Sequence, residues 1–408
     1  MPNLKILVIT SHDLMGSRFN GFDWQSSLSE LRVDLKMLVS RKASSNIGWV
    51  DTFNTGTLGA GKFFSKMKFL RTGEPSKNLD VSERVFDHPW YHEADLIHLQ
   101  IVLDGTLSLS TIERILEEKP TLWTWHDPAF LTGHCVTPMD CFRWTDNCGS
   151  CPDLARPFSV TIDKTHDVLQ KRHKLLNRAM NIHVSTNWMA NLVRSSLATS
   201  ELVINTFPFG IDHSRFTIKS DLRRKLGFPE NAIIIGIRAT NDTYKNFDFF
   251  KTALERVVTD NHVIVLTIGD LGLLNQSSVG KTIEIIEWPW VTKIEELVDY
   301  YNLLDLFISP SRFETFGLMG LEAMSCGVPV LGTKFSAVSE VCNLAEFGFE
   351  ISPLDINMFA NTLEDFMNHA LNPKKSRSEI RNFVIENYGL GEFNSVLVNT
   401  YQSILKQV

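Results

Sequence analysis

The stretch DLFISPSRFETFGLMGLEAMSCGVPVLG, residues 305–332, reads as a strand, a turn, a helix and a second strand. The first apolar run stops at Pro310, and the second follows Gly327. A helix beginning near Gly317 fits between the two runs. The stretch therefore predicts a βαβ unit, which belongs to a mostly parallel sheet.

Two glutamates, Glu314 and Glu322, lie in this unit. Glu322 shares a helical face with Leu318 and Cys326, so its carboxylate is placed against apolar neighbours. A buried carboxylate without partners is costly, which favours a ligand or partner for it. Glu314 lies in the loop at the helix N-terminus, where open α/β sheets bind phosphate in a crevice. An ordinary amphipathic helix with a solvated glutamate is the alternative reading.

Composition bounds the class of protein. With 408 residues the chain is longer than one typical core, so two domains are expected. Its 43% hydrophobic and 21% charged residues are typical of a soluble globular protein. A net charge of −7 without a long Lys/Arg run argues against nucleic acid as the main partner. The sequence shows no signal-peptide core and no apolar run of bilayer length, so we expect a cytoplasmic protein.

Strand and helix signals alternate along the chain. Apolar runs of strand length occur at 4–10, 34–39, 95–100, 121–126, 182–185 and 202–205, and again at 233–238, 263–268, 282–286, 305–309, 328–331 and 348–351. Helical patterns between them are clearest at 109–118, 164–179 and 187–197. This alternation predicts two mostly parallel sheets. We expect an N-terminal domain at 1–207 with a cysteine-rich insertion at 134–152, and a C-terminal domain at 208–390.

The phrase PSRFETFGLMGLEAMSCGVPV at 310–330 resembles the signature of the family 4 retaining glycosyltransferases, two glutamates separated by seven residues. The resemblance implies that Glu322 accepts hydrogen bonds from the ribose hydroxyls of a sugar nucleotide. It also implies that Glu314 lies near the donor sugar and diphosphate. Phe316, Gly317 and Leu318 join the expected donor-binding residues.

The resemblance implies a fold as well. Members of this family have the GT-B architecture, an α/β fold of two Rossmann-like, doubly wound parallel-sheet domains that face a cleft. The segment PFGIDHSRF at 208–216 resembles the family's phrase at the joint between the domains. A C-terminal helix, here 391–408, is expected to return to the N-terminal domain, which is the acceptor side.

Arg238 and Lys245 are the candidate cations for the donor. Transfer from a nucleotide sugar requires that the charge of the departing diphosphate be neutralised, by a metal or by fixed cations. The sequence holds no Asp-x-Asp motif, so we expect no catalytic metal. Arg238 ends the strand at 233–238, and Lys245 follows seven residues later at a helix start. The family places an Arg and a Lys in such a loop to bind the diphosphate, while solvated surface cations are the alternative.

His126 follows an apolar strand and is expected at a strand's carboxyl end. The segment TWHDPAFLTGHC around it resembles a subgroup of the family that builds bacterial capsule, exopolysaccharide and O-antigen. The resemblance implies that His126 contacts the donor sugar by hydrogen bonding, whereas a structural role at the strand end is the alternative. Gly16, in the loop after the first strand, is expected near the donor phosphates or the acceptor. The paired glycines of relatives are absent from LMGSRFNGF, which weakens that expectation.

Four cysteines, Cys135, Cys141, Cys148 and Cys151, fall within seventeen residues. In a cytoplasmic protein this clustering favours a structural zinc site over disulfides. His134 could compete as a ligand, and free or redox-active thiols are the alternative.

The segment 61–71, GKFFSKMKFLR, places Phe63, Phe64, Met67 and Leu70 on one helical stripe, with four cations around them. This is the chemistry of a helix at the surface of an anionic membrane. A surface helix that packs its apolar stripe on the sheet is the alternative.

Together these features predict a glycosyltransferase that moves a sugar from a nucleotide-diphosphate sugar to a glycan acceptor. We expect retention at the anomeric carbon, and the resemblance to polysaccharide enzymes suggests a polyprenyl-diphosphate-linked acceptor and peripheral membrane contact. The alternatives are a nucleotide-sugar epimerase or a phosphorylase on the same fold, or a non-catalytic nucleotide-sugar-binding protein.

Overall fold

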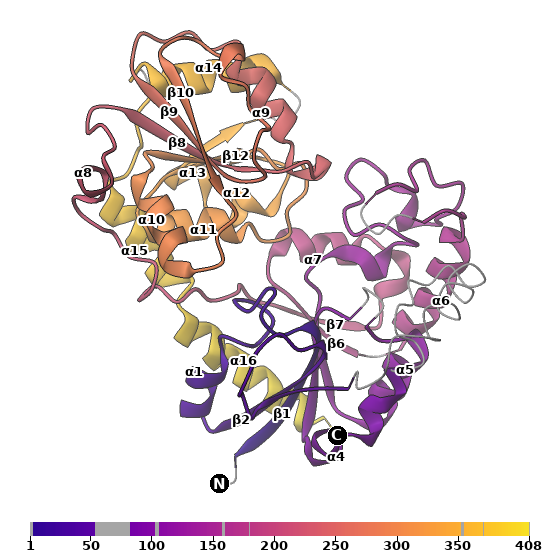
Figure 1. Ribbon diagram of the computed structural model, residues 1–408. Helices are drawn as coiled ribbons and strands as arrows, with labels where there is room; N and C mark the ends of the chain where they lie inside the picture. The colour runs from indigo at the N-terminus through magenta and orange to yellow at the C-terminus, as the bar shows by residue number, and fades with distance from the viewer. Residues whose placement is uncertain are drawn as a thin grey trace. The chain divides into compact units, whose positions relative to one another are not determined.

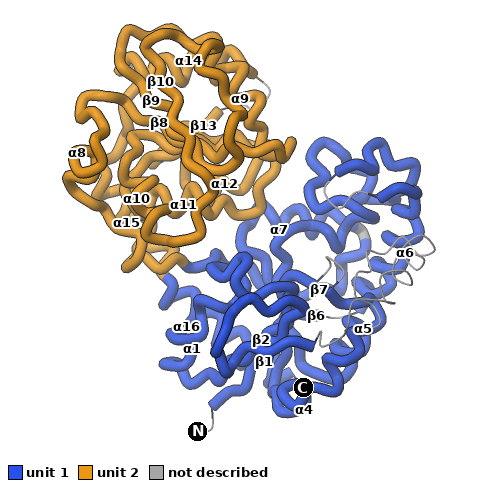
Figure 2. Tube along the Cα trace, viewed as in Figure 1, with its two compact units in different colours: residues 1–210, 390–408 blue, residues 211–389 orange. Residues whose placement is uncertain are grey.

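The computed structural model describes residues 3–53, 82–102, 106–156, 160–178, 180–351, 355–369 and 371–407. The segment 61–71, on which the expected membrane contact rests, lies outside these ranges. The chain divides into two compact units (Figure 2): residues 1–210 with 390–408 form unit 1, and residues 211–389 form unit 2. None of the helices in the described ranges has the length and apolar character needed to cross a bilayer.

Unit 1 is built on a seven-stranded parallel sheet (Figure 1). In spatial order its strands are β3 (Val50–Thr52), β2 (Val33–Arg41), β1 (Leu4–His12), β4 (Leu96–Leu99), β5 (Thr121–Thr124), β6 (Met180–Val184) and β7 (Leu202–Thr206). The strands read as almost continuous apolar runs, as expected when helices cover both faces. Residues 6–9 of β1, for example, are all at most 1% exposed.

The helices of unit 1 are α1 (Gln25–Glu30), α4 (Pro89–Glu93), α5 (Leu109–Glu118), α6 (Thr165–Leu176), α7 (Asn187–Arg194) and α16 (Leu390–Leu405), with 3₁₀ turns η1 (Glu83–Asp87), η2 (Pro128–Leu131), η3 (Arg143–Thr145) and η4 (Leu197–Thr199). The C-terminal helix α16 packs on α1 and β5. The Trp24 and Phe393 rings meet edge to face at 4.8 Å, and Asn394 donates a hydrogen bond to Ser27. Helix α16 therefore belongs to the packing of unit 1 although it follows unit 2 in the chain.

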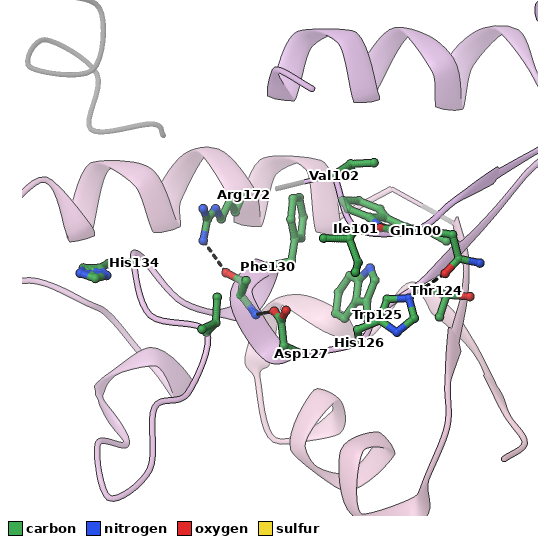
Figure 3. Close-up of a pocket in the computed structure, with 13 residues that line it drawn as sticks. Gln100, Ile101, Val102, Thr124, Trp125, His126, Asp127, Phe130, His134 and Arg172 are labelled. Atoms are coloured by element: carbon green, nitrogen blue, oxygen red, sulfur yellow. Dashed lines mark hydrogen bonds between the residues drawn. The ribbon is translucent and has the colours of Figure 1, made fainter. Parts of the chain in front are cut away.

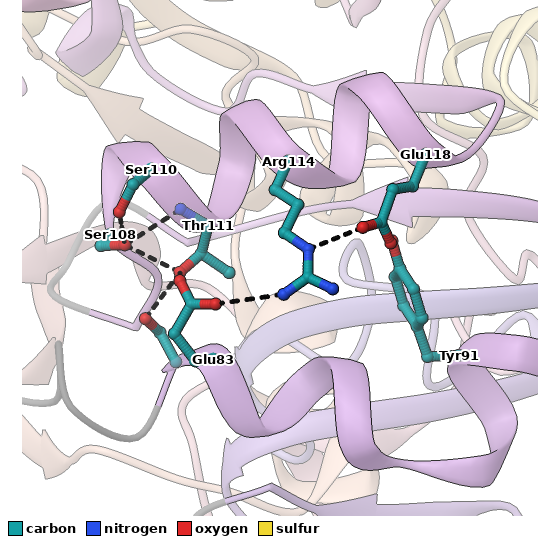
Figure 4. A network of polar contacts seen from close by, with 8 residues as sticks. Glu83, Tyr91, Ser108, Ser110, Thr111, Arg114 and Glu118 are labelled. Atoms are coloured by element: carbon teal, nitrogen blue, oxygen red, sulfur yellow. Dashed lines mark hydrogen bonds and ion pairs between the residues drawn. The ribbon is translucent and has the colours of Figure 1, made fainter.

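A polar network ties α5 to η1 and α4 on the surface of unit 1 (Figure 4). Arg114 forms ion pairs with Glu83 at 3.5 Å and with Glu118 at 2.6 Å, and Tyr91 donates a hydrogen bond to Glu118. The charged groups are half exposed, so solvent screens both ion pairs and they contribute little to stability. The apolar face of α5, which includes the buried Ile112 and Ile115, contributes more to its attachment.

Unit 2 is built on a six-stranded parallel sheet. In spatial order its strands are β10 (Ile283–Pro289), β9 (Val263–Gly269), β8 (Ile233–Ala239), β11 (Leu306–Ser309), β12 (Val330–Thr333) and β13 (Phe349–Ile351). Its helices are α8 (Leu222–Leu226), α9 (Phe247–Leu254), α10 (Ile294–Leu303), α11 (Leu318–Ser325), α12 (Ala337–Val341), α13 (Leu344–Phe347), α14 (Ile356–Met367) and α15 (Arg377–Asn387), with 3₁₀ turns η5 (Thr243–Lys245) and η6 (Gln276–Ser278).

Both sheets are doubly wound, and in such sheets ligands bind where the strand order reverses. In unit 1 the strand order reverses between β1 and β4, and in unit 2 it reverses between β8 and β11. At such a reversal the two following loops diverge, leaving a crevice beyond the carboxyl ends of the strands. We therefore expect each unit's site in the loops that follow these pairs of strands.

The predicted α/β fold class is confirmed, with two parallel sheets. All the strand-length runs identified in the sequence form strands, with ends that shift by a few residues. Strand β3 was missed because it is a three-residue edge strand with too few residues to show alternation.

Gly236 in β8 offers a test of how closely this sheet is covered. A Cβ at this position would meet the Leu304 side chain and lie 2.8 Å from Tyr300 Oη. We predict that Gly236→Ala lowers the free energy of unfolding by about 1–3 kcal/mol, because overpacking displaces neighbouring side chains. Urea denaturation of the full chain measures the change. Gly391→Ala is the matched control, since a Cβ there meets nothing within 4 Å. Equal losses in the two variants would contradict the packing argument.

Candidate functional site

In unit 2 the loops after β8 and β11 are bonded to each other. Asn246 lies between η5 and α9 in a left-handed conformation, φ 61°, which asparagine tolerates better than most residues. Its side chain donates a hydrogen bond to the Pro310 carbonyl at 3.2 Å, and the Arg312 amide donates to the Tyr244 carbonyl at 2.8 Å. These bonds hold the two loops together at the crevice of the sheet.

The predicted cations and the first glutamate meet in these loops. Lys245 forms an ion pair with Glu314, and the two side chains are only 17% and 20% exposed. The Arg238 guanidinium lies 5.1 Å over the Trp290 ring. Burial raises the pKa of Tyr244 to about 12, with Asp242 and Glu314 adding to the shift and Arg238 opposing it. Lys245 Nζ lies 5.3 Å from the centroid of the Tyr244 ring, so Tyr244 adjoins the Lys245–Glu314 pair. Arg238 lies at the end of β8, which pairs with β11, the strand before the Glu314 loop, so all three site residues belong to the same end of the sheet.

Helix α11 begins directly after Gly317, which has a left-handed φ of 87°. A Cβ at this position would lie 2.8 Å from Val338 Cγ2, so both the conformation and the close approach require glycine. The Ala337 amide donates a hydrogen bond to the Glu314 carbonyl at 2.9 Å, which fixes the loop before the helix. Of the other expected donor-binding residues, Phe316 is 6% exposed and Leu318 is partly exposed.

Glu322 is fully buried in α11, as the spacing predicted. Tyr301 of α10 donates a hydrogen bond to its carboxylate at 2.8 Å. A protein hydroxyl thus stabilises a charge that would otherwise be expensive to bury. Tyr301 was missed from the sequence because nothing in its local pattern distinguishes it from an ordinary core tyrosine.

In unit 1, His126 follows β5 and lies between two aromatic rings. Its ring centroid is 5.1 Å from that of Phe19 and 5.4 Å from that of Phe209, which stacks on it at 10°. Burial, with a smaller contribution from His183, lowers the pKa of His126 to about 3. His126 is therefore a neutral imidazole at physiological pH, suited to hydrogen bonding rather than to carrying charge.

The loop after β1 reaches the same place. Asn20 donates hydrogen bonds to the carbonyls of His12, Asp13 and Met15, which fold this loop around its own side chain. Gly16 in the loop has φ 77°, and a Cβ there would lie 2.7 Å from the Phe19 ring. Because Phe19 contacts His126, the structure brings Gly16 and His126 into one neighbourhood.

A pocket opens beside His126, at the carboxyl ends of β4 and β5 (Figure 3). Its cavity volume is about 70 Å³, and it is open to solvent. The lining residues are Gln100, Ile101, Val102, Trp123, Thr124, Trp125, His126, Asp127, Ala129, Phe130, His134, Val136 and Arg172. Two polar atoms on its wall, Trp125 Nε1 and His134 Nδ1, are buried without a hydrogen-bond partner in the part of the chain that the structure describes. A buried donor without a partner costs roughly 1–3 kcal/mol, so the pocket favours a polar occupant.

The wall of this pocket is rigid and largely aromatic. The Trp125 and Phe130 rings lie 5.6 Å apart, and the Trp123 ring contacts both. Arg172 donates hydrogen bonds to the Ala129 and Thr132 carbonyls, while the Asp127 carboxylate accepts one from the Ala129 amide. Gln100 and Trp125 were missed from the sequence, although both lie toward the ends of predicted strands, 95–100 and 121–126, which the structure shows to be neighbours.

The predicted zinc site is not supported. The four cysteines, all reduced, line one small pocket together with His134. Two of the thiols form hydrogen bonds with the backbone: Cys148 Sγ accepts one from the Gly133 amide, and Cys151 Sγ donates one to the Asp153 carbonyl. Burial raises the pKa of Cys148 to about 11. No group of three or more His, Cys, Asp or Glu side chains within the described ranges is disposed to hold a metal ion.

The predicted site residues thus fall into two groups. Arg238, Lys245 and Glu314 cluster in unit 2, where α11 also carries Glu322. In unit 1, His126 lies in one neighbourhood with Gly16.

Comparison with known proteins finds a family match within unit 2. Residues 218–383, about two fifths of the chain, match the family model of the glycosyl transferases group 1. The chain is 24% identical over 261 residues to WcaC of Escherichia coli K12, which is provisionally named a colanic acid biosynthesis glycosyl transferase; the match covers 60% of this chain and 61% of WcaC. A shorter match, 42% over 71 residues, covers 17% of this chain and 20% of the lipopolysaccharide core biosynthesis mannosyltransferase LpsB of Rhizobium meliloti.

Solved structures share the whole fold. Sucrose-phosphate synthase from Thermosynechococcus elongatus superimposes with a TM-score of 0.72 at 16% identity, covering 100% of both chains. HepE of Anabaena, solved in complex with UDP and glucose, gives 0.64 at 15% identity over 98% of this chain and all of its own. At these identities the structural likeness establishes the fold alone. The chain therefore carries a domain of the glycosyl transferases group 1 at 218–383, within the two-domain GT-B fold.

Proposed function

We propose that the protein is a glycosyltransferase that moves a sugar from a nucleotide-diphosphate sugar to a glycan acceptor. The observation that carries the proposal is the cluster of Arg238, Lys245 and Glu314 at the strand reversal of unit 2. Two cations held in the crevice beyond parallel strand ends match the charge of a diphosphate. The family match of 218–383 supports the same reading.

In this proposal the donor binds to unit 2. Arg238 and Lys245 bind the diphosphate and neutralise its charge as the anomeric bond breaks, which replaces a catalytic metal. Glu314 holds Lys245 in place and lies next to the donor sugar. Glu322 accepts hydrogen bonds from the ribose hydroxyls, and Phe316, Gly317 and Leu318 form the turn beside the diphosphate. The complex of HepE with UDP and glucose supports a uridine or similar nucleotide as donor.

We assign the acceptor to unit 1, in the pocket beside His126. Its aromatic wall suits the apolar C–H face of a sugar ring, and the Trp125 indole N–H is available to a sugar hydroxyl. His126 and the loop of Gly16 lie at the side of this pocket, where a neutral imidazole can hydrogen-bond a sugar hydroxyl.

The finer parts of the proposal rest on family resemblance and on the names of relatives. They are a hexose as the transferred sugar, retention at the anomeric carbon, and a polyprenyl-diphosphate-linked acceptor at the cytoplasmic face of a membrane. The names of WcaC and LpsB support a role in surface polysaccharide synthesis. Nuclear magnetic resonance of the isolated product tests retention directly, since inversion would give the opposite anomer.

We predict that Lys245→Ala and Arg238→Ala each lower kcat by about 10²–10³, because each removes a fixed charge from the developing leaving group. Release of nucleoside diphosphate from a panel of nucleotide sugars measures the rate. Lys281→Ala, at an exposed lysine of the same unit, is the control and should retain full activity. Full activity in both site variants would remove the basis of the donor assignment.

Trp125→Phe tests the acceptor pocket. The change keeps the aromatic wall and deletes the N–H donor, so we predict a rise of about 2- to 10-fold in the acceptor KM, measured with a panel of methyl hexosides. The donor KM should stay constant. Trp49→Phe, in the same unit but outside the pocket, should change neither constant. A rise in the donor KM alone would place the pocket on the donor side instead.

The pKa of His126 gives a pH prediction. Because the folded value is about 3 and an unfolded histidine has about 6.5, the imidazole stays neutral throughout pH 5–8. The unfolded state takes up the proton first as the pH falls below about 6.5, so stability is lost there, by up to about 2 kcal/mol per such histidine at pH 5. The ¹⁵N shifts of His126 should not titrate between pH 5 and 8. A midpoint near pH 6.5 would show that the ring is solvated and charged in part.

A further inference from the structure

A chain of buried polar side chains runs through unit 1 from His126 to the C-terminal helix α16. Its members are Gln100, His98, Thr124, His183 and Tyr401, which are 2%, 0%, 1%, 0% and 0% exposed. They come from β4 and the residue after it, from β5, from β6 and from α16. Donors and acceptors that are closed off from water in this way must be matched among themselves.

The distances define a single connected path. The Phe207 carbonyl is 2.8 Å from His183 Nε2, and Thr124 Oγ1 is 3.1 Å from His183 Nδ1 and 2.7 Å from His98 Nε2. Tyr401 Oη is 2.7 Å from His98 Nδ1. The Gln100 amide connects His98 to His126. Its nitrogen, as drawn, is 2.9 Å from His98 Nε2, and its oxygen is 2.7 Å from His126 Nε2.

One group in the path has a fixed role, because the Phe207 carbonyl can only accept. His183 therefore carries its proton on Nε2. Burial lowers the pKa of His183 to about 4, so the ring is neutral and its Nδ1 is an acceptor. The Thr124 hydroxyl is within reach of this nitrogen and donates to it.

The position of the Thr124 proton determines the tautomer of His98. Since the Thr124 proton is committed to His183, Thr124 Oγ1 accepts from His98, which places the His98 proton on Nε2. Burial also holds the pKa of His98 well below its usual range, so Nδ1 of this neutral ring is bare. Tyr401 donates to that nitrogen. Every group from Phe207 to Tyr401 now has a partner of the opposite kind.

The Gln100 amide transmits this arrangement to His126. A protonated His98 Nε2 requires the amide oxygen on its side, so the amide NH₂ faces His126. Figure 3 draws the amide with its oxygen toward His126; a half-turn about the last side-chain bond exchanges the two atoms without moving other groups. With the NH₂ donating, His126 Nε2 accepts and the ring proton lies on Nδ1.

We propose that Gln100, through the path from the Phe207 carbonyl, is a positioning residue that holds His126 as its Nδ1–H tautomer. His126 then donates a hydrogen bond from Nδ1 and keeps Nε2 as an acceptor for Gln100. Tyr401 completes the path from α16, so the helix that ends the chain takes part in setting the proton of a residue near the pocket. This assignment needs no substrate, and only its catalytic consequence rests on the proposed function.

The test is a long-range ¹H–¹⁵N correlation spectrum of the full chain labelled with ¹⁵N-histidine at pH 7, which distinguishes the two neutral tautomers. Signals of His126, His98 and His183 are assigned by single His→Gln variants. We expect His183 and His98 as Nε2–H and His126 as Nδ1–H. His126 found as Nε2–H would overturn the proposal.

The Gln100→Glu variant tests whether Gln100 determines the tautomer of His126. A carboxylate can only accept, so His126 should gain a proton on Nε2 in this variant, whereas a ring that already carried its proton on Nε2 would show no gain. Gln170→Glu, at an exposed position on α6, is the matched control and should leave His126 unchanged. If Gln100→Glu does not fold, Thr124→Val tests the same path: removing the relay oxygen should leave His126 as a mixture of tautomers, and an unchanged single tautomer would contradict the relay.

Activity gives an independent readout. A glutamate beside His126 raises the pKa of the imidazole, so the ratio of the Gln100→Glu transfer rate to the native rate should change with pH between 5 and 8. A transferase assay that fails for the native protein would count against the proposed function and leave the tautomer measurement standing.

Discussion

The reversal of strand order in each sheet is the constraint on which the candidate site depends. Parallel strands covered on both faces leave polar groups little room except at the strand ends, and the reversal between β8 and β11 opens one such place in unit 2. Arg238 reaches it from the end of β8, and Glu314 from the loop after β11. The hydrogen bonds of Asn246 and Arg312 between the two loops then fix the distance over which Lys245 and Glu314 pair.

Unit 1 uses the same topology for a different chemistry. Its loops after β1, β4 and β5 bring together an imidazole of depressed pKa, an amide and aromatic rings, and within the described residues the Trp125 indole N–H has no hydrogen-bond partner. Asp127 and Arg172 also line this pocket, and both are bonded to the backbone. A charged crevice in one unit and a largely aromatic pocket in the other suit two different substrates. A diphosphate requires fixed charge, while a sugar ring is bound by stacking and hydrogen bonds.

The sequence allowed much of this arrangement to be predicted. The strand runs, the helix start at Gly317 and the burial of Glu322 follow from periodicity and from glycine's tolerance of positive φ, which are local properties. The partners of the site residues could not be found in this way. Tyr301 and Tyr401 meet Glu322 and His98 only after the helices pack, and Tyr401 lies 303 positions from His98. The cysteine spacing suggested zinc, but spacing does not determine where thiols point; here Cys148 and Cys151 bond to the backbone, and the described residues contain no group disposed to hold a metal.

The central claim is that unit 2 holds a nucleoside diphosphate in the crevice between β8 and β11. Calorimetric titration of the full chain with UDP, GDP, ADP, CDP and TDP, each against the native protein and Glu322→Gln, tests it most directly. The account predicts that at least one of them binds the native protein with one site per chain. Glu322→Gln keeps a partner for Tyr301 and removes the charge, so affinity for that nucleotide should fall by about 10-fold or more. Failure of all five to bind the native chain, or equal binding by the variant, would contradict the account.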